Sequence, residues 1–417
     1  MEEGLLADVP GNPRSNLIEI NDDLAHVVNV LAAGGYGVWV VGGAIRDALL
    51  GKNPTDFDIC TTAVPEEIVE SFENTIPTGI QFGTVTVCSG DSYFQVTTLR
   101  TESSYGDGRR PDEVEWGDSL SIDLSRRDFT MNSMAYDCAR KLLHDPYGGE
   151  EDLKRGLLCA VGDPQHRLSE DGLRVIRAYR FMDRGNSGIW PPNEALSAAL
   201  IDNRSMILMS SAERIWPELR QIISGENAST VLSRMYRDGI LGTLTGTSFP
   251  INAFEEIDKT PCDTHVRLAL LFQSHSIKEL TSTLKKLKMS NDDIKRTKHL
   301  RFLIDNIPSN NELRIYRTVI GDEVKTHISL IKSKNGDVSM MEKSLDYPVN
   351  VKCIIDGKWL MKRTNLEPGN KLGRLKEWLH RIQIERNLKH ESEIEAVLCT
   401  IPWQHGDPNE WPKMQWP

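Results

Sequence analysis

The sequence lacks any long apolar run. No stretch of its 417 residues approaches the roughly 18 consecutive apolar residues that cross a membrane. It begins Met-Glu-Glu-Gly, which is acidic and unlike a secretory signal or a transit peptide. Hydrophobic residues make up 39% and charged residues 26%, which is ordinary for a soluble protein. We therefore expect no membrane partner and, from the length, about two to four domains.

Cysteine is scarce and has no motif. The seven cysteines are scattered and odd in number, and they form no C-x-x-C pair. This argues against a disulfide framework and against structural zinc. We expect free thiols in a reducing compartment, and hence a cytoplasmic protein.

The chain also lacks an excess of positive charge, since its net charge is −11. The charge is unevenly distributed along the chain. Residues 278–301 contain eight Lys or Arg against three acids, and residues 351–390 contain ten against four. Such local excess fits contact with a phosphate backbone, but a solvated helix face explains it equally well. Charge alone does not indicate RNA binding.

The most informative motif present is Val41-Gly-Gly-Ala-Ile-Arg-Asp47, followed by Asp56-Phe-Asp58. A predicted strand runs into a Gly-Gly turn and a helix, where bare backbone N–H groups and the helix dipole favour phosphate. Asp56 and Asp58 lie two apart in a predicted strand over 56–60, so both carboxylates project from one face. Adjacent carboxylates repel unless a cation lies between them, and oxygen ligands suit Mg²⁺. Each motif alone is common elsewhere, but their order predicts phosphoryl or nucleotidyl transfer.

The N-terminal third alternates between helical and strand patterns. Helices are predicted over 24–31 and 65–72, and strands over 37–41, 56–60, 83–89 and 93–99. Gly90-Asp91 joins the last two strands as a hairpin. This pattern predicts an α/β domain with a partly antiparallel sheet.

Beyond Asp145 the strand signals fade. Helices are predicted from an N-cap at Ser169 through Arg180, and over 212–222, 230–241, 266–271, 277–288, 291–304 and 372–386. Residues 332–348 are polar and weakly patterned, which favours a linker. For the Trp-rich end of the chain two arrangements stay open, packed onto the preceding helices or loose.

Two arginine-rich motifs follow the predicted sheet. Ser125-Arg-Arg-Asp-Phe-Thr-Met-Asn132 offers bidentate phosphate donors and polar groups for a ribose hydroxyl, although a helix cap with surface ion pairs is the alternative. In the second motif, Asp171, Arg174, Arg177 and Arg180 recur every third residue and form a polar stripe on the predicted helix. A salt-bridged amphipathic helix, with Leu173, Ile176 and Phe181 on its buried side, is the alternative there.

An Asp beside an Arg has a chemical meaning for base choice. Cytosine and adenine each present an exocyclic amine donor beside a ring-nitrogen acceptor, whereas uracil and guanine present a carbonyl beside an N–H. Asp171 and Arg174 are therefore predicted to accept C and A and to reject U and G.

The motifs GGAIRD, DFDI, FGTVTV, RRDFTMNSMAYD, SEDGLRVIRAYRF and SAERIWPEL occur in this order. As a set they resemble the class II tRNA nucleotidyltransferases, which are the CCA-adding enzymes and their poly(A) polymerase relatives. The resemblance is dense over 38–241. It implies an α+β fold, with a polymerase β-like mixed-sheet head over 1–150, then an all-α neck over 151–220, body over 221–331 and tail over 349–417.

The resemblance also implies a role for each matching residue. Asp56 and Asp58 would be catalytic and hold two Mg²⁺ ions. The implied nucleotide-binding residues are Gly43, Arg46 and Arg127 at the triphosphate, Asp128 and Asn132 at the ribose, Asp171 and Arg174 at the base, with Arg177 and Arg180 beside them. A flexible loop containing Asp107, Arg109 and Arg110 would help to change the pocket from CTP to ATP. Partners would be tRNA, CTP and ATP.

One departure concerns the third acid of the family pattern, because Gln95 stands where many relatives carry Glu. Either the two aspartates suffice or metal binding is weaker. The predicted activity is untemplated addition of C, C and A to tRNA. Rivals are an A-adding, CC-adding or poly(A)-polymerase activity, and a catalytically silent tRNA-binding protein.

Overall fold

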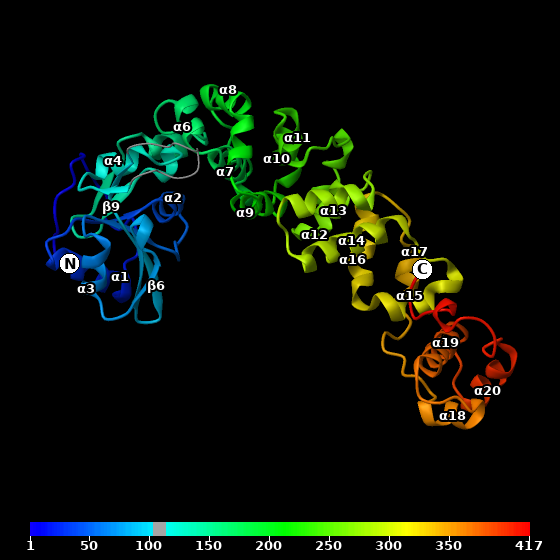
Figure 1. The fold of residues 1–417 in the computed structure, drawn as a ribbon. Helices are drawn as coiled ribbons and strands as arrows, with labels where there is room; N and C mark the ends of the chain where they lie inside the picture. The colour runs from blue at the N-terminus through cyan, green and yellow to red at the C-terminus, as the bar shows by residue number, and fades with distance from the viewer. Residues whose placement is uncertain (103–113) are drawn as a thin grey trace. The chain divides into compact units, whose positions relative to one another are not determined.

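A computed structural model of the chain describes residues 1–102 and 114–417. It forms two compact units, which we describe separately. Unit 1 comprises Met1–Ser248 with Lys286–Lys288, and unit 2 comprises Phe249–Lys285 with Met289–Pro417. In Figure 1 the ribbon of unit 1 runs from blue to green, and that of unit 2 from green to red. Within the described residues, no helix is both long and apolar enough to cross a bilayer.

Unit 1 begins with a mixed sheet that has eight strands among the described residues, in the order β1-β10-β9-β2-β3-β6-β5-β4. The strands are β1 (Asn12–Pro13), β2 (Val38–Val41), β3 (Asp58–Thr61), β4 (Thr75–Gly79), β5 (Thr84–Ser89), β6 (Ser92–Thr98), β9 (Ala135–Asp137) and β10 (Leu142–His144). β3 and β6 pair in parallel, and the other neighbours of this sheet are antiparallel. β7 (Arg100–Glu102) and β8 (Val114–Trp116) form a separate antiparallel pair. The predicted partly antiparallel sheet is confirmed.

The hairpin β5–β6 follows from side-chain alternation. Val85 and Val87 are fully buried, whereas Thr84 and Thr86, which alternate with them, are partly exposed. Gly90 turns the chain with φ +57°, a conformation that costs glycine little. α1 (Asp22–Ala33) and α3 (Pro65–Ser71) both pack against β5. Asn21 caps α1, since its side chain accepts a hydrogen bond from the backbone of Leu24 at 2.8 Å.

The remaining helices of unit 1 are short and closely packed. They are α2 (Gly43–Leu49), α4 (Leu120–Ser125), α5 (Gly149–Arg155), α6 (Pro164–Glu170), α7 (Leu173–Met182), α8 (Glu194–Asp202), α9 (Ala212–Ile223), α10 (Ala228–Arg237) and α11 (Ile240–Thr245). α7 and α9 lie side by side, as the green part of Figure 1 shows. The single helix predicted over 230–241 is interrupted before α11, because Gly239 adopts φ +79°.

The helix predicted from Ser169 through Arg180 is wrong, because two helices meet there. Ser169 lies inside α6, and Asp171 has extended backbone at φ −145° and ψ 111°. Gly172 then caps α7. A Cβ at Gly172 would lie 1.9 Å from the carbonyl oxygen of Met206, so the close approach of that chain requires glycine.

Among its described residues, unit 2 contains helices and loops but no strand. Its helices are α12 (Thr264–Leu271), α13 (Ile277–Lys286), α14 (Asn291–Asp305), α15 (Leu313–Ile320), α16 (Val324–Ser333), α17 (Ser339–Ser344), α18 (Gly357–Thr364), α19 (Asn370–Arg386) and α20 (Glu391–Thr400). The prediction of a linker over 332–348 is wrong in part, because α17 lies within it and buries Met341 completely.

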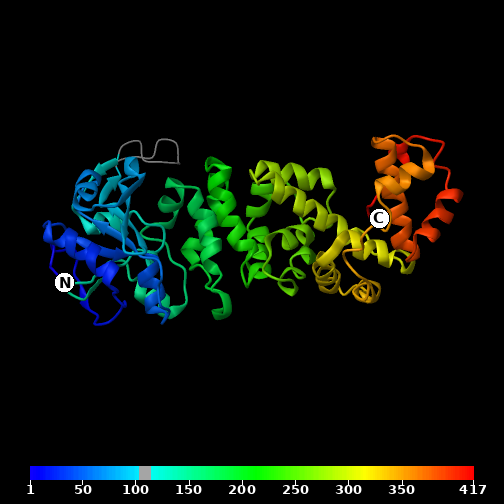
Figure 2. The ribbon, with the colours of Figure 1, turned by 90° about the horizontal axis from the view of Figure 1, so that it is seen from below.

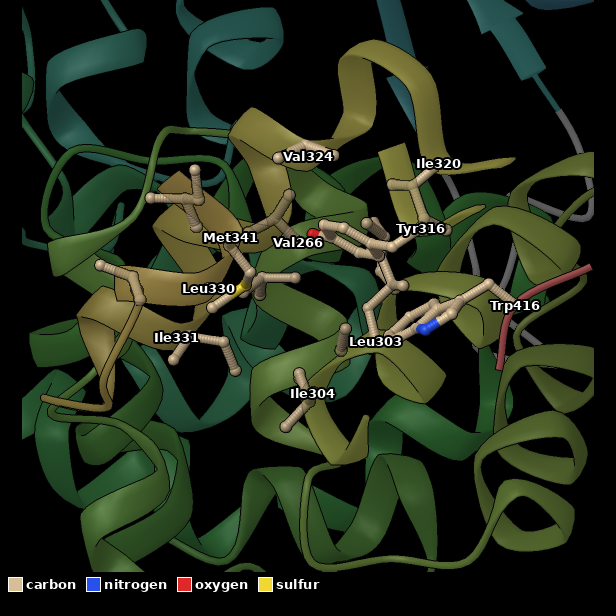
Figure 3. Packing of buried hydrophobic residues seen from close by; sticks show 14 of the residues in the cluster. Val266, Leu303, Ile304, Tyr316, Ile320, Val324, Leu330, Ile331, Met341 and Trp416 are labelled. Carbon is tan, nitrogen blue, oxygen red and sulfur yellow. The ribbon is translucent and has the colours of Figure 1, made fainter. Parts of the chain in front are cut away.

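Two hydrophobic clusters hold unit 2 together. The first joins α12 and α14–α17, and Figure 3 shows Val266, Leu303, Tyr316 and Met341 converging in it. The second joins α18, α19 and α20. The C-terminal segment reaches both, because Trp411 packs in the second cluster and Trp416 in the first. Figures 1 and 2 show the red segment leaving α20 and ending beside the yellow helices.

Candidate active site

A cavity of about 350 Å³ in unit 1 brings together most of the predicted site residues. They come from four parts of the chain: the Gly-Gly turn with α2, the start of β3, the segment after α4, and α7 with the break before it. Of the predicted residues, the cavity wall includes Gly43, Arg46, Asp58, Arg127, Asp128, Asn132, Asp171, Arg174 and Arg177.

The Gly-Gly turn takes the conformation that the sequence predicts. Gly42 has a backbone φ of +72°, which residues other than glycine rarely adopt, and α2 begins at Gly43. The Gly42 N–H donates to the carbonyl of Met134 at 3.2 Å, which ties the turn to the segment before β9. A Cβ at Gly42 would lie 3.4 Å from Nη1 of Arg127, so the turn also leaves room for that guanidinium.

The carboxylate pair lies at the start of β3. Asp56 and Asp58 are exposed on either side of the buried Phe57, which is the predicted alternation, although the strand begins at Asp58 rather than two residues earlier. Desolvation by the surrounding protein raises the pKa of Asp58, the charge of Asp56 raises it further, and Arg127 opposes both. Gln95 is the register partner of Asp58 on the parallel strand β6. Asp56 does not itself line the cavity.

Asp128 and Asn132 form a buried polar network with two arginines. Oδ1 of Asp128 accepts hydrogen bonds from Phe129 N at 2.8 Å and from Asn132 Nδ2 at 3.2 Å. Its Oδ2 lies 2.6 Å from Nη2 of Arg177. Burial alone would raise the pKa of Asp128, but the charge of Arg177 and these hydrogen bonds lower it. Arg46 Nη1 donates to Asn132 Oδ1 at 2.9 Å.

Asp171 lies in the break between α6 and α7, not on the helix. Its Oδ1 accepts from Leu173 N at 3.0 Å, and its Oδ2 lies 2.6 Å from Nη2 of Arg214 on α9. The predicted continuous stripe through Asp171 is therefore wrong. The break nevertheless turns the Asp171 side chain into the cavity wall, beside Arg174.

Arg174 lies in the cavity wall with 8% of its surface exposed. Its Nη2 donates to the Arg126 carbonyl at 2.8 Å, and its Nη1 donates to the Arg167 carbonyl at 2.8 Å and pairs with Glu170. The guanidinium that is predicted to read the base is thus fastened to the arginine segment after α4.

Arg180 does not line the cavity. Its Nε lies 2.6 Å from Oε2 of Glu218, its Nη1 donates to Gln221 at 2.9 Å, and its guanidinium lies 4.1 Å from the centre of the Phe181 ring. The Phe181 ring is also 5.3 Å from the Arg177 guanidinium and 5.6 Å from that of Arg46. These contacts place three arginines around one aromatic ring.

Five further residues line the cavity wall without having been predicted individually as site residues, although Gly42 and Arg126 belong to motifs predicted to bind phosphate. They are Gly42, Arg126, Leu173, Phe181 and Arg214. Leu173 and Phe181 were predicted on the buried side of the helix. Phe181 is buried and also lines the cavity, whereas Leu173, which lines it too, is partly exposed. Arg126 adjoins the predicted Arg127, so the Arg-Arg pair itself was the available signal. For Arg214, the SAERIWPEL motif was the sequence signal available.

Asp107, Arg109 and Arg110, predicted as a flexible loop, lie outside the described residues. Within the described part of the chain, no group of three or more His, Cys, Asp or Glu side chains is placed to hold a metal. Asp56 and Asp58 remain as a pair. The pKa of Asp58 is raised by desolvation and then by the charge of Asp56, which fits a site that a divalent cation would neutralise.

A mixed sheet that carries paired aspartates beside a glycine turn and facing arginines defines a nucleotidyltransferase head. Residues 38–159 match a family model described as the poly A polymerase head domain. The chain is 42% identical over 214 residues to the CCA-adding enzyme of Geobacillus sp. (strain WCH70), an alignment that spans 51% of this chain and only 52% of that protein. It is 31% identical over 386 residues to the CCA-adding enzyme of Lactobacillus helveticus (strain DPC 4571), covering 89% of this chain and 95% of that one.

The fold agrees with these alignments. The crystal structure of Bacillus stearothermophilus CCA-adding enzyme in complex with CTP matches with a TM-score of 0.75 and 25% identity, over 91% of this chain and 96% of that chain. The α+β fold with a mixed-sheet head and helical remainder is thereby confirmed. The chain belongs to the family of CCA-adding enzymes.

Proposed function

We propose that this protein adds C, C and A to the 3′ end of tRNA from CTP and ATP, without a nucleic-acid template. The observation that carries the proposal is the single cavity in which Asp58, the Gly-Gly turn, Asp171 and the arginines converge. Its volume of about 350 Å³ suits one small ligand, and its wall provides groups for a phosphate, a ribose and a base at once.

The triphosphate is proposed to lie against Gly43, Arg46 and Arg127. Guanidinium groups bind phosphate oxygens bidentately, and the bare turn leaves room for a phosphate to approach the backbone. Asp128 and Asn132 are proposed to face the ribose. Their mutual hydrogen bond at 3.2 Å supports this, because a ribose hydroxyl can join an existing polar network without new desolvation.

Base choice is proposed to rest on Asp171 and Arg174. Each carboxylate oxygen accepts more than one hydrogen bond, so Asp171 keeps acceptor capacity for an exocyclic amine beside its bonds to Leu173 and Arg214. Arg174 would supply the donor. A wrong base would leave these partly buried groups unpaired, which is costly. Arg177 holds Asp128 and is proposed to act beside them, and Arg180 is proposed to act through Phe181.

Asp56 and Asp58 are proposed to hold two Mg²⁺ ions. Bound Mg²⁺ supplies Lewis acidity toward the attacking 3′-hydroxyl and the departing pyrophosphate. The protein's own share is to position the reactants and to stabilise charge with fixed arginines. Gln95 is neutral and lies beside Asp58, so only Asp56 and Asp58 would supply negative charge to the two metal ions.

tRNA is proposed to bind along the helical part of the chain, with the head at 1–150, neck at 151–220, body at 221–331 and tail at 349–417. A surface groove of unit 2 supports this, because Lys278, Lys285 and Lys298 line it together with two hydroxyl side chains. A cytoplasmic setting is proposed as well, supported by seven free cysteines.

The test is to incubate the protein with tRNA ending at the discriminator base, Mg²⁺, CTP and ATP, and to sequence the 3′ ends. Addition of CCA is expected. Arrest after CC, addition of A only to tRNA that already ends in CC, or repeated A addition to unstructured RNA would identify a partial-specificity relative. Binding of tRNA without incorporation would identify a silent binding protein.

A further inference from the structure

Asp123 lies behind the cavity wall and contacts both arginines of the Arg126-Arg127 pair. It lines no part of the cavity, and its side chain is 1% exposed. Its Oδ1 lies 2.5 Å from Nη2 and 3.0 Å from Nε of Arg126. Its Oδ2 lies 3.0 Å from Nη2 and 3.3 Å from Nε of Arg127. Each carboxylate oxygen thus serves one guanidinium.

The position of Asp123 in the chain explains this double contact. α4 ends at Ser125, so Arg126 and Arg127 follow Asp123 by three and four residues, the spacings at which side chains on one helical turn meet. Two adjacent guanidiniums would repel each other, and a buried carboxylate between them offsets that repulsion. Burial alone would raise the pKa of Asp123, but the charges of Arg127 and Arg126 lower it.

Both arginines present their remaining surface to the cavity. Arg127 also lies near the carboxylate pair, since its charge opposes the pKa increase of Asp58. A free arginine side chain loses rotamer entropy when it is fixed, and a partner that fixes it beforehand removes that cost from ligand binding.

We propose that Asp123 is a positioning residue that preorganises Arg126 and Arg127 for the polyphosphate tail of the incoming nucleotide. The inference rests on the proposed function, which makes a nucleoside triphosphate the ligand. Asp123 makes no contact with Asp171 or Arg174, so its effect belongs to the phosphates that CTP and ATP share and not to the base.

The sign of the effect separates positioning from a simple electrostatic role. Removing a negative charge beside the cavity makes it more positive, which by long-range electrostatics alone would strengthen binding of an anion. Loss of preorganisation does the opposite. A weaker CTP complex in Asp123→Asn therefore cannot come from the lost charge acting at a distance.

The experiment measures dissociation constants for CTP, ATP and CMP by calorimetry, with the full chain and Mg²⁺. In Asp123→Asn, affinity for CTP and for ATP should fall by the same factor, about tenfold, while affinity for CMP changes less than about twofold. Asp118→Asn is the matched control, because it removes an exposed carboxylate five residues earlier; it should change none of the three constants. Unchanged or tighter CTP binding in Asp123→Asn overturns the inference.

Two further variants cover the case in which Asp123→Asn fails to fold. Asp123→Glu keeps the charge but displaces the carboxylate by one methylene, so it should lower the CTP-to-CMP affinity ratio while thermal unfolding stays near wild type; an unchanged ratio overturns the inference. In an Arg127→Ala background, Asp123→Asn should lower CTP affinity by a smaller factor than in wild type, because one of the two arginines that Asp123 positions is absent. A wild-type protein that binds CTP no more tightly than CMP would instead refute the proposed function.

Discussion

At the scale of single residues, arginines outnumber aspartates in the cavity wall. Six arginines and three aspartates line its wall. Each aspartate has a separate partner set: Asp58 is crowded by Asp56, Asp128 is held by Arg177, and Asp171 by Arg214. The excess of guanidinium donors over carboxylates in the wall itself suits a polyanion such as a triphosphate.

Replacing Asp56 with alanine tests the carboxylate pair. Incorporation of both CTP and ATP into tRNA should fall by at least about a thousandfold, because metal-assisted charge stabilisation contributes several kcal/mol to such transfers. tRNA affinity, measured by filter binding, should change little. Asp91→Ala in the exposed hairpin turn is the control and should leave both quantities unchanged. Incorporation that survives in Asp56→Ala would remove the basis of the proposed mechanism.

Replacing Arg174 with alanine tests base choice. Discrimination against UTP and GTP should fall by about a hundredfold, which is what leaving a base-pairing group unmatched typically costs, while the rate with CTP falls less. Single-turnover incorporation of each of the four nucleotides gives both numbers. Arg155→Ala, at an exposed position on α5, provides the control. Selectivity that stays at the wild-type level would contradict the assignment of Arg174.

Most of the cavity wall could be predicted from residue order, because the Gly-Gly turn, Asp-x-Asp and Arg-Arg-Asp motifs are local. Arg214 could not, since its contact with Asp171 joins residues 43 apart through the packing of α7 on α9. Arg180 was predicted at the nucleotide, but Glu218 and Gln221 hold it outside the cavity wall. Such choices among several charged partners depend on tertiary packing, which local spacing does not encode.

At the scale of secondary-structure elements, the strands β2, β3, β5 and β6 were predicted, whereas the strands of two or three residues were not. The hairpin β5–β6 shows a clear alternation over six and seven residues. β1, β9 and β10 have only two or three residues each, too few for a period, and they exist because they pair with one another and with β2. The break before α7 was not predicted, because the residues on both sides of it keep a helical spacing.

Replacing Gly172 with alanine tests that break. The new Cβ would meet the backbone of Met206 at 1.9 Å, so the chain must shift, at a cost of about 1–3 kcal/mol. We expect a lower unfolding temperature together with weaker discrimination among nucleotides, because Asp171 would move with the break. Gly242→Ala is the matched control: nothing lies within 4 Å of its added Cβ, and helix propensity predicts a small stabilisation. Equal unfolding temperatures for the two variants would argue against the tight contact.

At the scale of the whole molecule, unit 2 contains a titratable group beside the aromatic side chains of its first cluster. His327 is fully buried, and its Nδ1 lies 2.8 Å from the hydroxyl of Tyr316. Trp416 lies 6.3 Å away, ring centre to ring centre. The pKa of His327 is lowered to about 4: burial lowers it most and the charge of His299 adds to this, whereas the Leu303 backbone and the charge of Glu323 raise it.

The low pKa of His327 predicts acid sensitivity for unit 2. In the unfolded chain His327 is protonated below about pH 6.5, whereas in the folded chain it is protonated only below about pH 4. The free energy of unfolding should therefore fall by on the order of 3 kcal/mol as the pH is lowered through this window. Urea unfolding at pH 7 and pH 5, followed by tryptophan fluorescence, measures the loss. In His327→Asn, which cannot titrate, the pH dependence should shrink. An equal dependence in both proteins would place the acid-sensitive group elsewhere.

The C-terminal segment links the two clusters of unit 2, and it is the feature on which the sequence left two arrangements open. Arg381 Nη1 donates to the carbonyls of Lys413 at 2.7 Å and Gln415 at 2.9 Å, and the N–H of Met414 donates to Glu377. Trp416 then enters the first cluster, where its ring centre lies 4.7 Å from that of Tyr316 (Figure 3). Because tryptophan buries a large apolar area, one side chain here stabilises helices that are distant in sequence.

Replacing Trp416 with alanine should therefore cost unit 2 about 3–5 kcal/mol, the usual loss for a large buried aromatic side chain. Hydrogen exchange should accelerate in α15 and α16, whose side chains surround the ring, while unit 1 keeps its exchange rates and its affinity for CTP. Addition to tRNA should fall even so, if the helical part of the chain holds the RNA. Gln415→Ala, which alters an exposed neighbour in the same segment, should leave exchange and addition at wild-type levels. If Trp416→Ala left α15 and α16 as protected as before, the segment would be a surface attachment rather than part of the core.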